Sequence, residues 1–264
     1  MTSTGTCRRI MRSIHSTNPW IFLSPHLDDA ILSCGALVQA EVKRREITVA
    51  TLFTEASQPP HTHAAKAFMR QCSASDAGSL FAARRAEDRR VLSDVGARCI
   101  HLGVADALYR QRHGSNTFAN LGRLVPELVH RYPTYRFDIA HGRVSKGDQR
   151  LITLLHARVR DLIAATHAEL VFTPLGVGRH VDHLITRAIG SGFPDQVVYY
   201  SDFPYNQTHR VDDAFINTNY LAQWTWGENL PAKQPLIRSY ATQAHALFAK
   251  GDIPIASEVY YSAS

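Results

Sequence analysis

The feature that most constrains the fold of this chain is the alternation of short apolar runs with longer amphipathic segments. The short runs are rich in β-branched residues, as buried strands are. We expect strands over residues 21–23, 47–53, 98–102, 169–172 and 196–200, and an edge strand over 258–260. The intervening segments predict helices over 28 or 29 to 45, 81–95, 149–166, 182–189 and 235–249. Strand–helix–strand order gives parallel, right-handed units, so the sequence predicts a three-layer α/β fold with a mainly parallel sheet.

Two long segments have no clear periodicity. Residues 54–80 are polar and irregular, and long loops of this kind are often functional. Residues 106–147 are hard to assign, apart from a helix expected near 121–131. A length of 264 residues fits a single domain over 1–264, with residues 1–18 as a flexible lead-in.

Composition argues against several classes of partner. The net charge of +6 comes from 29 basic and 23 acidic residues, but the densest basic segment, 84–90, is interrupted by Glu87 and Asp88. With no nucleic-acid motif, we expect no nucleic-acid partner. No run reaches the roughly 20 apolar residues of a transmembrane helix, and the amino-terminal segment does not read as a secretory signal. We therefore expect a cytoplasmic protein. Its four cysteines are scattered without paired spacing, so we expect them to be reduced thiols: Cys7, Cys34, Cys72 and Cys99.

The first polar cluster is Ser24-Pro25-His26-Leu27-Asp28-Asp29. It follows the first predicted strand and precedes a helix, at the carboxyl end of the sheet, where open α/β folds build their sites. Imidazole and carboxylate are ligand types that suit zinc. The side chains of Asp28 and Asp29 point in different directions, so one can bind metal while the other faces substrate. The alternative is that one of them simply caps the helix.

The second cluster, His180-Val181-Asp182-His183, also lies between a predicted strand and a predicted helix. It offers a ligand, an acid or base and a supporting carboxylate within four residues. The alternative is a polar helix start, capped by Asp182, with exposed histidines. Because both clusters follow strands, a parallel sheet would bring them together.

These motifs resemble the PIG-L (LmbE-like) N-deacetylase family. The resemblance rests on Ser24 to Asp29, Gly35 and His180 to His183, and covers roughly residues 20–200. It implies a Rossmann-like α/β/α fold and one catalytic Zn²⁺ per chain. It also implies removal of acetyl groups from N-acetylglucosaminyl lipids, thiol-cofactor precursors, chito-oligosaccharides or antibiotics.

The resemblance also implies roles for individual residues. The implied zinc ligands are His26, Asp29 and His183. Asp28 would be the general base, His180 a general acid or oxyanion partner that is protonated when it acts, and Asp182 would orient a histidine. Either Asp28 or His180 would protonate the leaving amine.

The chain departs from the family motif at two positions. Leu27 stands where the motif has proline, and Ala30 stands where it has glutamate. Ala30 removes a carboxylate but none of the implied ligands or the implied base.

Three further residues are candidates for substrate binding. Glu55 and Asp106 follow predicted strands, and the resemblance suggests sugar-hydroxyl contacts there, assisted by Arg84 or Arg85. An ordinary surface or capping role stays open for each. We expect the loops over 54–80, 104–148 and 201–234 to shape the pocket.

Other histidines and tryptophans have less specific interpretations. We expect no second metal site from five scattered histidines, which we interpret as surface or core residues: His61, His63, His101, His113 and His141. Trp224 and Trp226 are expected to pack in the core or a lid, with sugar stacking as the alternative.

The sequence as a whole favours a zinc-dependent hydrolase that removes the acetyl group from an N-acetylamino sugar, as a glycoside or a sugar-bearing natural product. Its partner would be this small-molecule substrate, and a homo-oligomer is compatible with the sequence. The alternatives are hydrolysis of another amide and a non-catalytic, metal-stabilised sugar-binding module. Asp28 argues against the module, because binding alone needs no carboxylate beside the ligand set.

Overall fold

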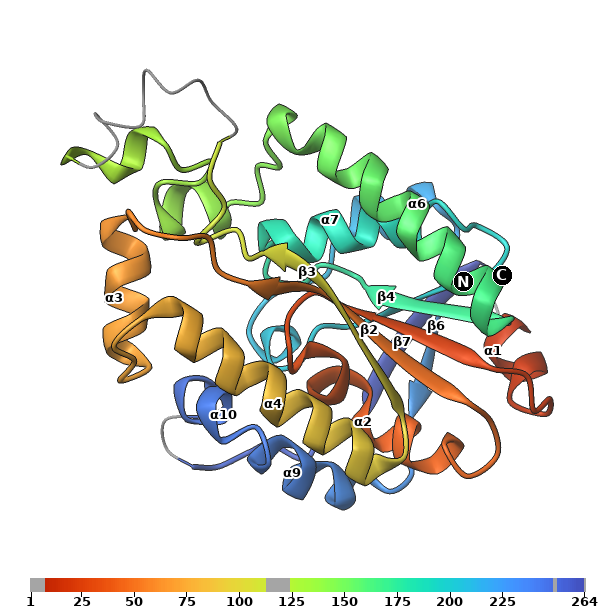
Figure 1. Cartoon of the computed structure of the whole chain (residues 1–264). Coiled ribbons are helices and arrows are strands. Elements are labelled where there is room, and N and C mark those ends of the chain that lie inside the picture. Colours follow the sequence, from red (N-terminus) through yellow and green to blue (C-terminus); the bar gives the residue numbers. More distant parts are fainter. Residues whose placement is uncertain (1–7, 113–123, 249–250, 264) are drawn as a thin grey trace.

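The structure is a computed structural model that describes residues 8–112, 124–248 and 251–263. Its centre is a seven-stranded sheet in the order β3-β2-β1-β4-β5-β7-β6 (Figure 1). The strands are β1 Trp20–Ser24, β2 Ile47–Glu55, β3 Arg98–Ala105, β4 Leu170–Pro174, β5 Val197–Tyr200, β6 Leu221–Trp226 and β7 Glu258–Ala263. Strands β1 to β5 are parallel, and β7 runs antiparallel to β5 and β6.

Helices cover both faces of the sheet, which confirms the three-layer α/β arrangement. The α-helices given for the described residues are α1 Arg8–Ser13, α2 Asp29–Glu41, α3 His63–Gln71, α4 Ala77–Val95, α6 Gln149–Thr166, α7 Val181–Gly190, α8 Asp213–Thr218, α9 Leu230–Arg238 and α10 Ala241–Leu247. In Figure 1, α6 and α7 lie on one face, while α4, α9 and α10 lie on the other. Every helix within the described part of the chain is too short or too polar to cross a bilayer.

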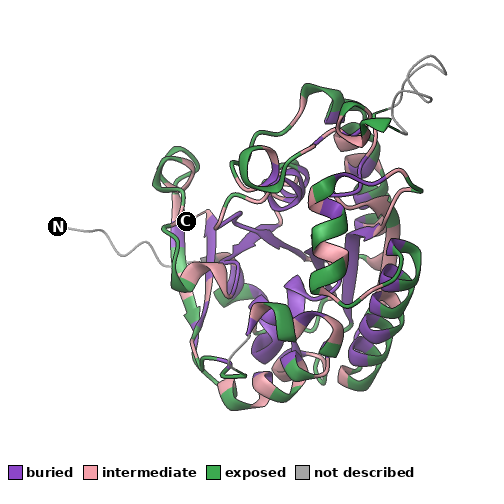
Figure 2. Ribbon diagram, turned by 90° about the vertical axis from the view of Figure 1, so that its left-hand side faces the viewer, coloured by how far each residue is buried: buried purple, intermediate pink, exposed green. Residues whose placement is uncertain are grey.

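The central strand β1 is buried on both sides, which explains its uninterrupted apolar sequence. Trp20 and Phe22 belong to the core on the α2 side, and Ile21 and Leu23 belong to the core on the α7 side. Successive side chains of a strand point to opposite faces, so one apolar run supplies both cores. Figure 2 shows the buried residues concentrated along the strands and the helix faces turned toward them.

The chain order of the strands creates a crevice beside β1. From β1 the chain continues to β2 and β3 on one side, whereas β4 and β5 lie on the other. β1 pairs directly with β4, with Trp20 opposite Leu170 and Phe22 opposite Phe172. Loops leaving two adjacent parallel strands in opposite directions leave space between them at the carboxyl edge. Both polar clusters of the sequence follow these two strands.

The structure differs from the sequence expectations at several helices. The expected loop over 54–80 contains α3 and the start of α4, because Thr62 and Asp76 cap them by accepting hydrogen bonds from Ala65 N and Ser79 N. Residues 121–123 of the helix expected near 121–131 lie outside the described residues; Leu124 is helical, and residues 126–128 form a short 3₁₀ turn.

At the carboxyl-terminal end, two expectations were wrong. The helix expected over 235–249 is divided into α9 and α10 at Tyr240, whose buried hydroxyl donates to Asp88 Oδ1 at 2.7 Å. The strand expected at the edge is β7, which lies inside the sheet because β6 pairs with its outer side. β6 places Trp226 in the core and packs Trp224 against it, as expected for core packing.

The described part of the amino-terminal segment contacts the core. α1 buries Ile10 fully, and Ser13 Oγ accepts a hydrogen bond from Trp20 Nε1 at 2.8 Å. Residues 1–7 lie outside the described residues, and so does Cys7. The described cysteines, Cys34, Cys72 and Cys99, are free thiols, as expected.

Substitution of Phe172 tests this core. The centroid of its ring lies 4.2 Å from that of Phe22, on which it stacks, and 5.1 Å from that of Trp20. Phe172→Ala should lower the free energy of unfolding by about 3–5 kcal/mol, measured by urea denaturation. Phe172→Leu should lower it less, because a smaller cavity remains. The exposed Leu154 is the control, and Leu154→Ala should change stability by no more than about 0.5 kcal/mol. Equal losses at both positions would contradict this description of the core.

Candidate active site

The turn after β1 places the first cluster at the carboxyl edge of the sheet. Ser24 Oγ donates to the carbonyl oxygen of His26 at 2.6 Å and accepts from Ala30 N at 3.0 Å. These two hydrogen bonds close the turn between β1 and α2. The turn therefore holds His26, Asp28 and Asp29 beside the end of β4.

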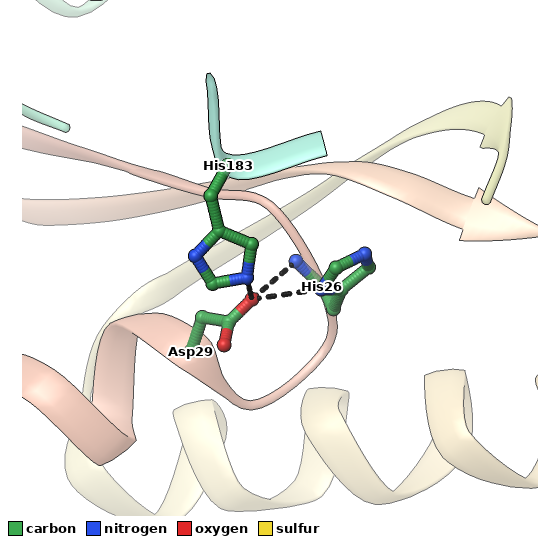
Figure 3. A group of neighbouring side chains, drawn as sticks. All are labelled: His26, Asp29 and His183. Carbon is green, nitrogen blue, oxygen red and sulfur yellow. Dashed lines mark hydrogen bonds and ion pairs between the residues drawn. The ribbon is translucent and has the colours of Figure 1, made fainter. Parts of the chain in front are cut away.

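Asp29 joins the two clusters through one carboxylate oxygen. Its Oδ2 atom lies 3.0 Å from His26 Nδ1 and 3.3 Å from His183 Nε2 (Figure 3). The same oxygen accepts from the His26 backbone N–H at 2.9 Å. One ligand atom from each of these residues lies within 4.8 Å of the other two, as metal ligands must. Two imidazoles and one carboxylate are a donor set of catalytic zinc sites that leaves a coordination position free.

Each imidazole has its second nitrogen held by a further carboxylate. His183 Nδ1 lies 2.6 Å from Asp202 Oδ1, and His26 Nε2 lies 3.3 Å from Asp182 Oδ2. Asp202 is itself held by the backbone N–H groups of Gly176 and Val177 at 2.8 Å. Carboxylates in this position fix the tautomer and orientation of metal-binding histidines. They leave His26 Nδ1 and His183 Nε2 facing Asp29.

Asp182 is neutralised from the side opposite His26. The Arg110 guanidinium donates to Asp182 Oδ1 and to Asp148 Oδ2, the latter at 2.9 Å. Ala107 N donates to Asp182 Oδ2 at 2.8 Å. Burial alone would raise the pKa of Asp182, but Arg110 and His26 hold it well below its usual range. Because these partners already occupy Asp182, we favour Asp29 over Asp182 as the carboxylate ligand.

The candidate metal ligands are the buried Asp29 and His183 and the partly exposed His26. Burial alone would lower the pKa of His183, but Asp29 and Asp202 raise it to about 10. Burial likewise opposes ionisation of Asp29, but His183 and His26 hold its pKa well below the usual range. Burial would also lower the pKa of His26, but hydrogen bonds to Asp182 and Asp29 raise it, so protons compete with a metal ion for these imidazole nitrogens.

Asp28 is the N-cap residue of α2, yet its side chain makes no capping hydrogen bond. The capping alternative therefore does not account for it. Its side chain lines a cavity together with His26 and His180. Burial and the adjacent charge of Asp29 raise the pKa of Asp28 to about 7. A carboxylate with a pKa near neutrality can both accept and return a proton at physiological pH.

His180 begins α7 and caps it with its own ring. Its Nδ1 atom accepts from Asp182 N at 3.2 Å, so the neutral ring carries its proton on Nε2. Burial and the neighbouring His26 lower the pKa of His180 well below its usual value. The His180 ring lies edge-on to His26, with ring centroids 4.9 Å apart. His180 is therefore a neutral Nε2–H donor beside the cluster.

The three candidates for substrate binding are placed differently. Arg84 and Asp106 line the cavity, and Asp106 Oδ2 lies 3.5 Å from His26 Nε2. Glu55 forms an ion pair with Arg85 at 2.8 Å, and its side chain is 42% exposed. Glu55 is not among the described residues that line the cavity.

Two buried donors in the cavity wall have unpaired nitrogen atoms among the described residues. Arg84 and Gln243 are 8% and 5% exposed, and neither Arg84 Nε nor Gln243 Nε2 has a hydrogen-bond partner. Unpaired buried donors cost free energy, so a ligand that accepts from them would bind favourably. Gln243 lies on α10, within the segment 235–249 that we expected from the sequence to form one continuous helix.

Sequence reasoning missed three residues that support the site: Asp202, Arg110 and Gln243. Asp202 follows β5 as the two clusters follow β1 and β4, so the same post-strand argument could have found it. Arg110 lies in a segment without periodicity and acts through long-range ion pairs, which sequence spacing does not reveal.

Comparison with known proteins gives one family and several relatives. The family model for PIG-L, GlcNAc-PI de-N-acetylase, matches residues 21–193. A 2'-N-acetylparomamine deacetylase of Niallia circulans is 26% identical over 258 residues, covering 88% of this chain and 82% of the relative. A 2'-N-acetylparomamine deacetylase of Streptomyces fradiae is 28% identical over 199 residues, covering 73% and 60%.

Two solved structures share the fold. The zinc inhibited form of teicoplanin deacetylase Orf2 has a TM-score of 0.72 at 21% identity, covering 92% of this chain and 97% of that structure. The A40926 pseudoaglycone deacetylase Dbv21 has a TM-score of 0.64 at 23% identity, covering 93% and 96%. The Rossmann-like arrangement expected from the sequence is thereby confirmed.

Asp28 and Asp29 should respond in opposite ways to the same change. Asp28→Asn should keep bound zinc but lose turnover by about 100-fold or more, because an amide cannot accept a proton from water. Asp29→Asn should lose zinc, because a neutral amide oxygen is a poorer ligand than a carboxylate. Zinc content and acetate release would be measured for both, with the exposed Asp94→Asn as the control. Zinc loss in Asp28→Asn with retention in Asp29→Asn would exchange the two roles.

Asp202 should control metal affinity without touching the ion. Asp202→Asn should weaken zinc binding by about 10–100-fold, because His183 loses the carboxylate that orients its ring. Competition with a chromophoric chelator measures this affinity. Asp195→Asn, an exposed change near β5, should leave it unaltered. Unchanged affinity in Asp202→Asn would show that Asp29 and the imidazoles suffice to hold the ion.

Proposed function

This chain belongs to the PIG-L (GlcNAc-PI de-N-acetylase) family, and we propose that it is a zinc-dependent hydrolase of the N-acetyl amide in an acetamido sugar. The substrate we propose is a glycoside or sugar-bearing natural product. The observation that carries this proposal is the position of Asp28. Its carboxylate is buried beside the His26–Asp29–His183 group and makes no capping hydrogen bond to α2. It supplies a proton acceptor next to a metal donor set, which is the combination that amide hydrolysis requires.

The donor set fits one zinc ion per chain. His26, Asp29 and His183 would hold it, with Asp182 and Asp202 fixing the two imidazoles. When bound, zinc supplies Lewis acidity that polarises an amide carbonyl and activates water. The identity of the metal as zinc is part of our proposal, and it rests on the nitrogen and oxygen donors of the group.

Asp28 moves the proton in this proposal. Its carboxylate faces the cavity and takes a proton from the attacking water as the carbon–oxygen bond forms. The protonated Asp28 then lies beside the amine that departs when the carbon–nitrogen bond breaks. A pKa raised to about 7 favours both steps, because neither protonation state is strongly preferred near neutrality.

His180 would stabilise the negative charge that develops on the amide oxygen. Its Nδ1 is occupied by the N–H of Asp182, so Nε2–H is the free donor. The neutral ring needs no proton uptake before it donates. We therefore propose a neutral His180 in place of the protonated His180 expected from the sequence. A fixed donor aimed at the developing oxyanion is a large source of rate enhancement. This assignment leaves Asp28 as the group that protonates the amine.

The cavities support a substrate larger than one sugar ring. The inner cavity at Asp28 and His180 has a volume of about 130 Å³ and is walled by Arg84, Asp106 and Gln243. A second cavity of about 440 Å³ shares Tyr205 and Leu247 with it. We infer that the acetamido group enters the inner cavity while the remainder of the substrate occupies the outer one. The relatives named 2'-N-acetylparomamine deacetylases support this substrate class, because their name gives an N-acetylated compound as the substrate.

Acetate release from a defined panel tests this function. The panel holds free N-acetylglucosamine, a 2'-N-acetylated aminoglycoside pseudodisaccharide, an N-acetylglucosaminyl glycopeptide antibiotic and a simple N-acetyl amino acid. We expect acetate from the glycosides, with kcat/KM lower for free N-acetylglucosamine because it cannot fill the outer cavity. Release from the amino acid alone would indicate a hydrolase of another amide. Zinc and sugar binding with no acetate from any compound would indicate a binding module.

The pH dependence of kcat/KM should depend on the charge of Arg84, which acts through the pKa of Asp28. Asp28 must be ionised to accept a proton, so activity falls as the pH falls through its pKa. Arg84 lowers that pKa, so Arg84→Gln should move the acid limb of kcat/KM to higher pH. Arg85→Gln is the matched control, because Arg85 pairs with Glu55 outside the cavity lining. An acid limb that stays in place in Arg84→Gln, at equal zinc content, would mean that Asp28 does not set it.

A further inference from the structure

A second group of metal-ligand side chains lies on the edge strand β3. Cys99 and His101 are two residues apart on this strand, so their side chains point to the same face of the sheet. Asp88 of α4 packs against that face. The Cys99 Sγ atom lies 3.2 Å from His101 Nε2 and 3.6 Å from Asp88 Oδ2, and His101 Nε2 lies 2.8 Å from the same Asp88 oxygen.

These separations match those that a tetrahedral ion imposes or fall short of them by up to about 0.5 Å. Zinc bonds of about 2.0–2.3 Å at tetrahedral angles place the donor atoms about 3.3–3.8 Å apart. Small side-chain rotations would bring the three donors to these distances. Asp88 is buried, whereas Cys99 and His101 are partly exposed, so an ion and a water ligand can reach the group.

The group shares no residue with the active-site group His26, Asp29 and His183. Its donors come from α4 and β3, although the charge of Asp88 contributes to the raised pKa of Asp28. The other oxygen of Asp88 accepts from the Tyr240 hydroxyl at 2.7 Å. Asp88 thus contacts both the edge strand β3, through His101, and the break between α9 and α10, through Tyr240. It lies one helical turn after Arg84, which lines the cavity.

We propose that Asp88, Cys99 and His101 form a second metal site, which takes a zinc-like divalent ion and ties α4 to the edge strand β3. A thiolate ligand selects zinc and similar ions over magnesium and calcium, which prefer oxygen. On binding, Cys99 Sγ gives its proton to solvent and forms the metal–sulfur bond, while His101 binds as a neutral imidazole. Water completes the four ligands. The expectation from the sequence that His101 is only a surface or core residue is revised accordingly.

The rival explanation is a hydrogen-bonded trio without metal. In that arrangement the imidazole N–H and the thiol both donate to Asp88 Oδ2, and Cys99 stays a neutral thiol. Burial and the charge of Asp88 raise the pKa of the Cys99 thiol to about 12, so in the absence of a cation the sulfur keeps its proton. The two explanations differ in whether a sulfur–metal bond forms.

Cobalt distinguishes them, because a thiolate–cobalt(II) bond gives a near-ultraviolet charge-transfer band, whereas imidazole and carboxylate ligands do not. The active-site group contains no sulfur, so the band reports the second site alone. The metal-free, full-length protein would be titrated with Co²⁺ under reducing conditions, with bound cobalt measured by elemental analysis. We expect about two ions per chain and the band in the wild type, and loss of the band with one ion in Cys99→Ser.

Two variants complete the test. Cys72→Ser is the matched control, a partly exposed free cysteine outside the group, and should keep the band and both ions. His183→Ala should lose one ion but keep the band. The proposal is overturned if the wild type binds no more than one ion without the band, or if the band persists in Cys99→Ser. Acetate release is scored separately, so failure of this site leaves the deacetylase function to be judged on its own assay.

Discussion

The arrangement of the site depends on placing the Asp29 carboxylate between two imidazoles at the junction of β1 and β4. A buried charge without partners would be strongly destabilising, so Asp29 requires His26 and His183 on either side. Those imidazoles in turn require Asp182 and Asp202 behind them, and Asp182 requires Arg110. The partners come from the turn after β1, the segment after β3, helix α7 and the segment after β5, so the network forms only when these parallel strands are paired.

The same fold gives two adjacent aspartates opposite properties. Asp29 is surrounded by imidazoles, which hold its pKa well below the usual range, whereas burial and the charge of Asp29 raise the pKa of Asp28 to about 7. Pairs of titratable groups whose pKa values are pushed apart are typical of sites where one binds and the other moves protons. Here the difference follows from the turn after β1, which directs one side chain to the histidines and the other to the cavity.

The helix α4 connects the cavity with the edge of the sheet. Arg84 lines the cavity, Glu87 accepts from the N–H and hydroxyl of Thr242 just before Gln243, and Asp88 contacts Tyr240 and His101. The segment around α10 is therefore held in place by polar contacts with α4. Because Gln243 carries an unpaired donor into the inner cavity, the position of α10 shapes part of that cavity. Leu247 of the same helix also lines the outer cavity, so the α4–α10 contact influences the shape of both.

The sequence by itself determined the strand–helix alternation, the two polar clusters after β1 and β4 and their family resemblance, because these depend on short-range pattern. It did not determine that β7 lies inside the sheet, that α9 and α10 separate at Tyr240, or that Asp202 and Gln243 belong to the site, because strand pairing and buried polar contacts join residues far apart in the chain. The roles of Asp28 and Asp29 were available only through the resemblance, since two identical neighbours look alike in a sequence. Only the tertiary structure gives them different surroundings, because burial and nearby charge, not residue type, set the pKa of a carboxylate.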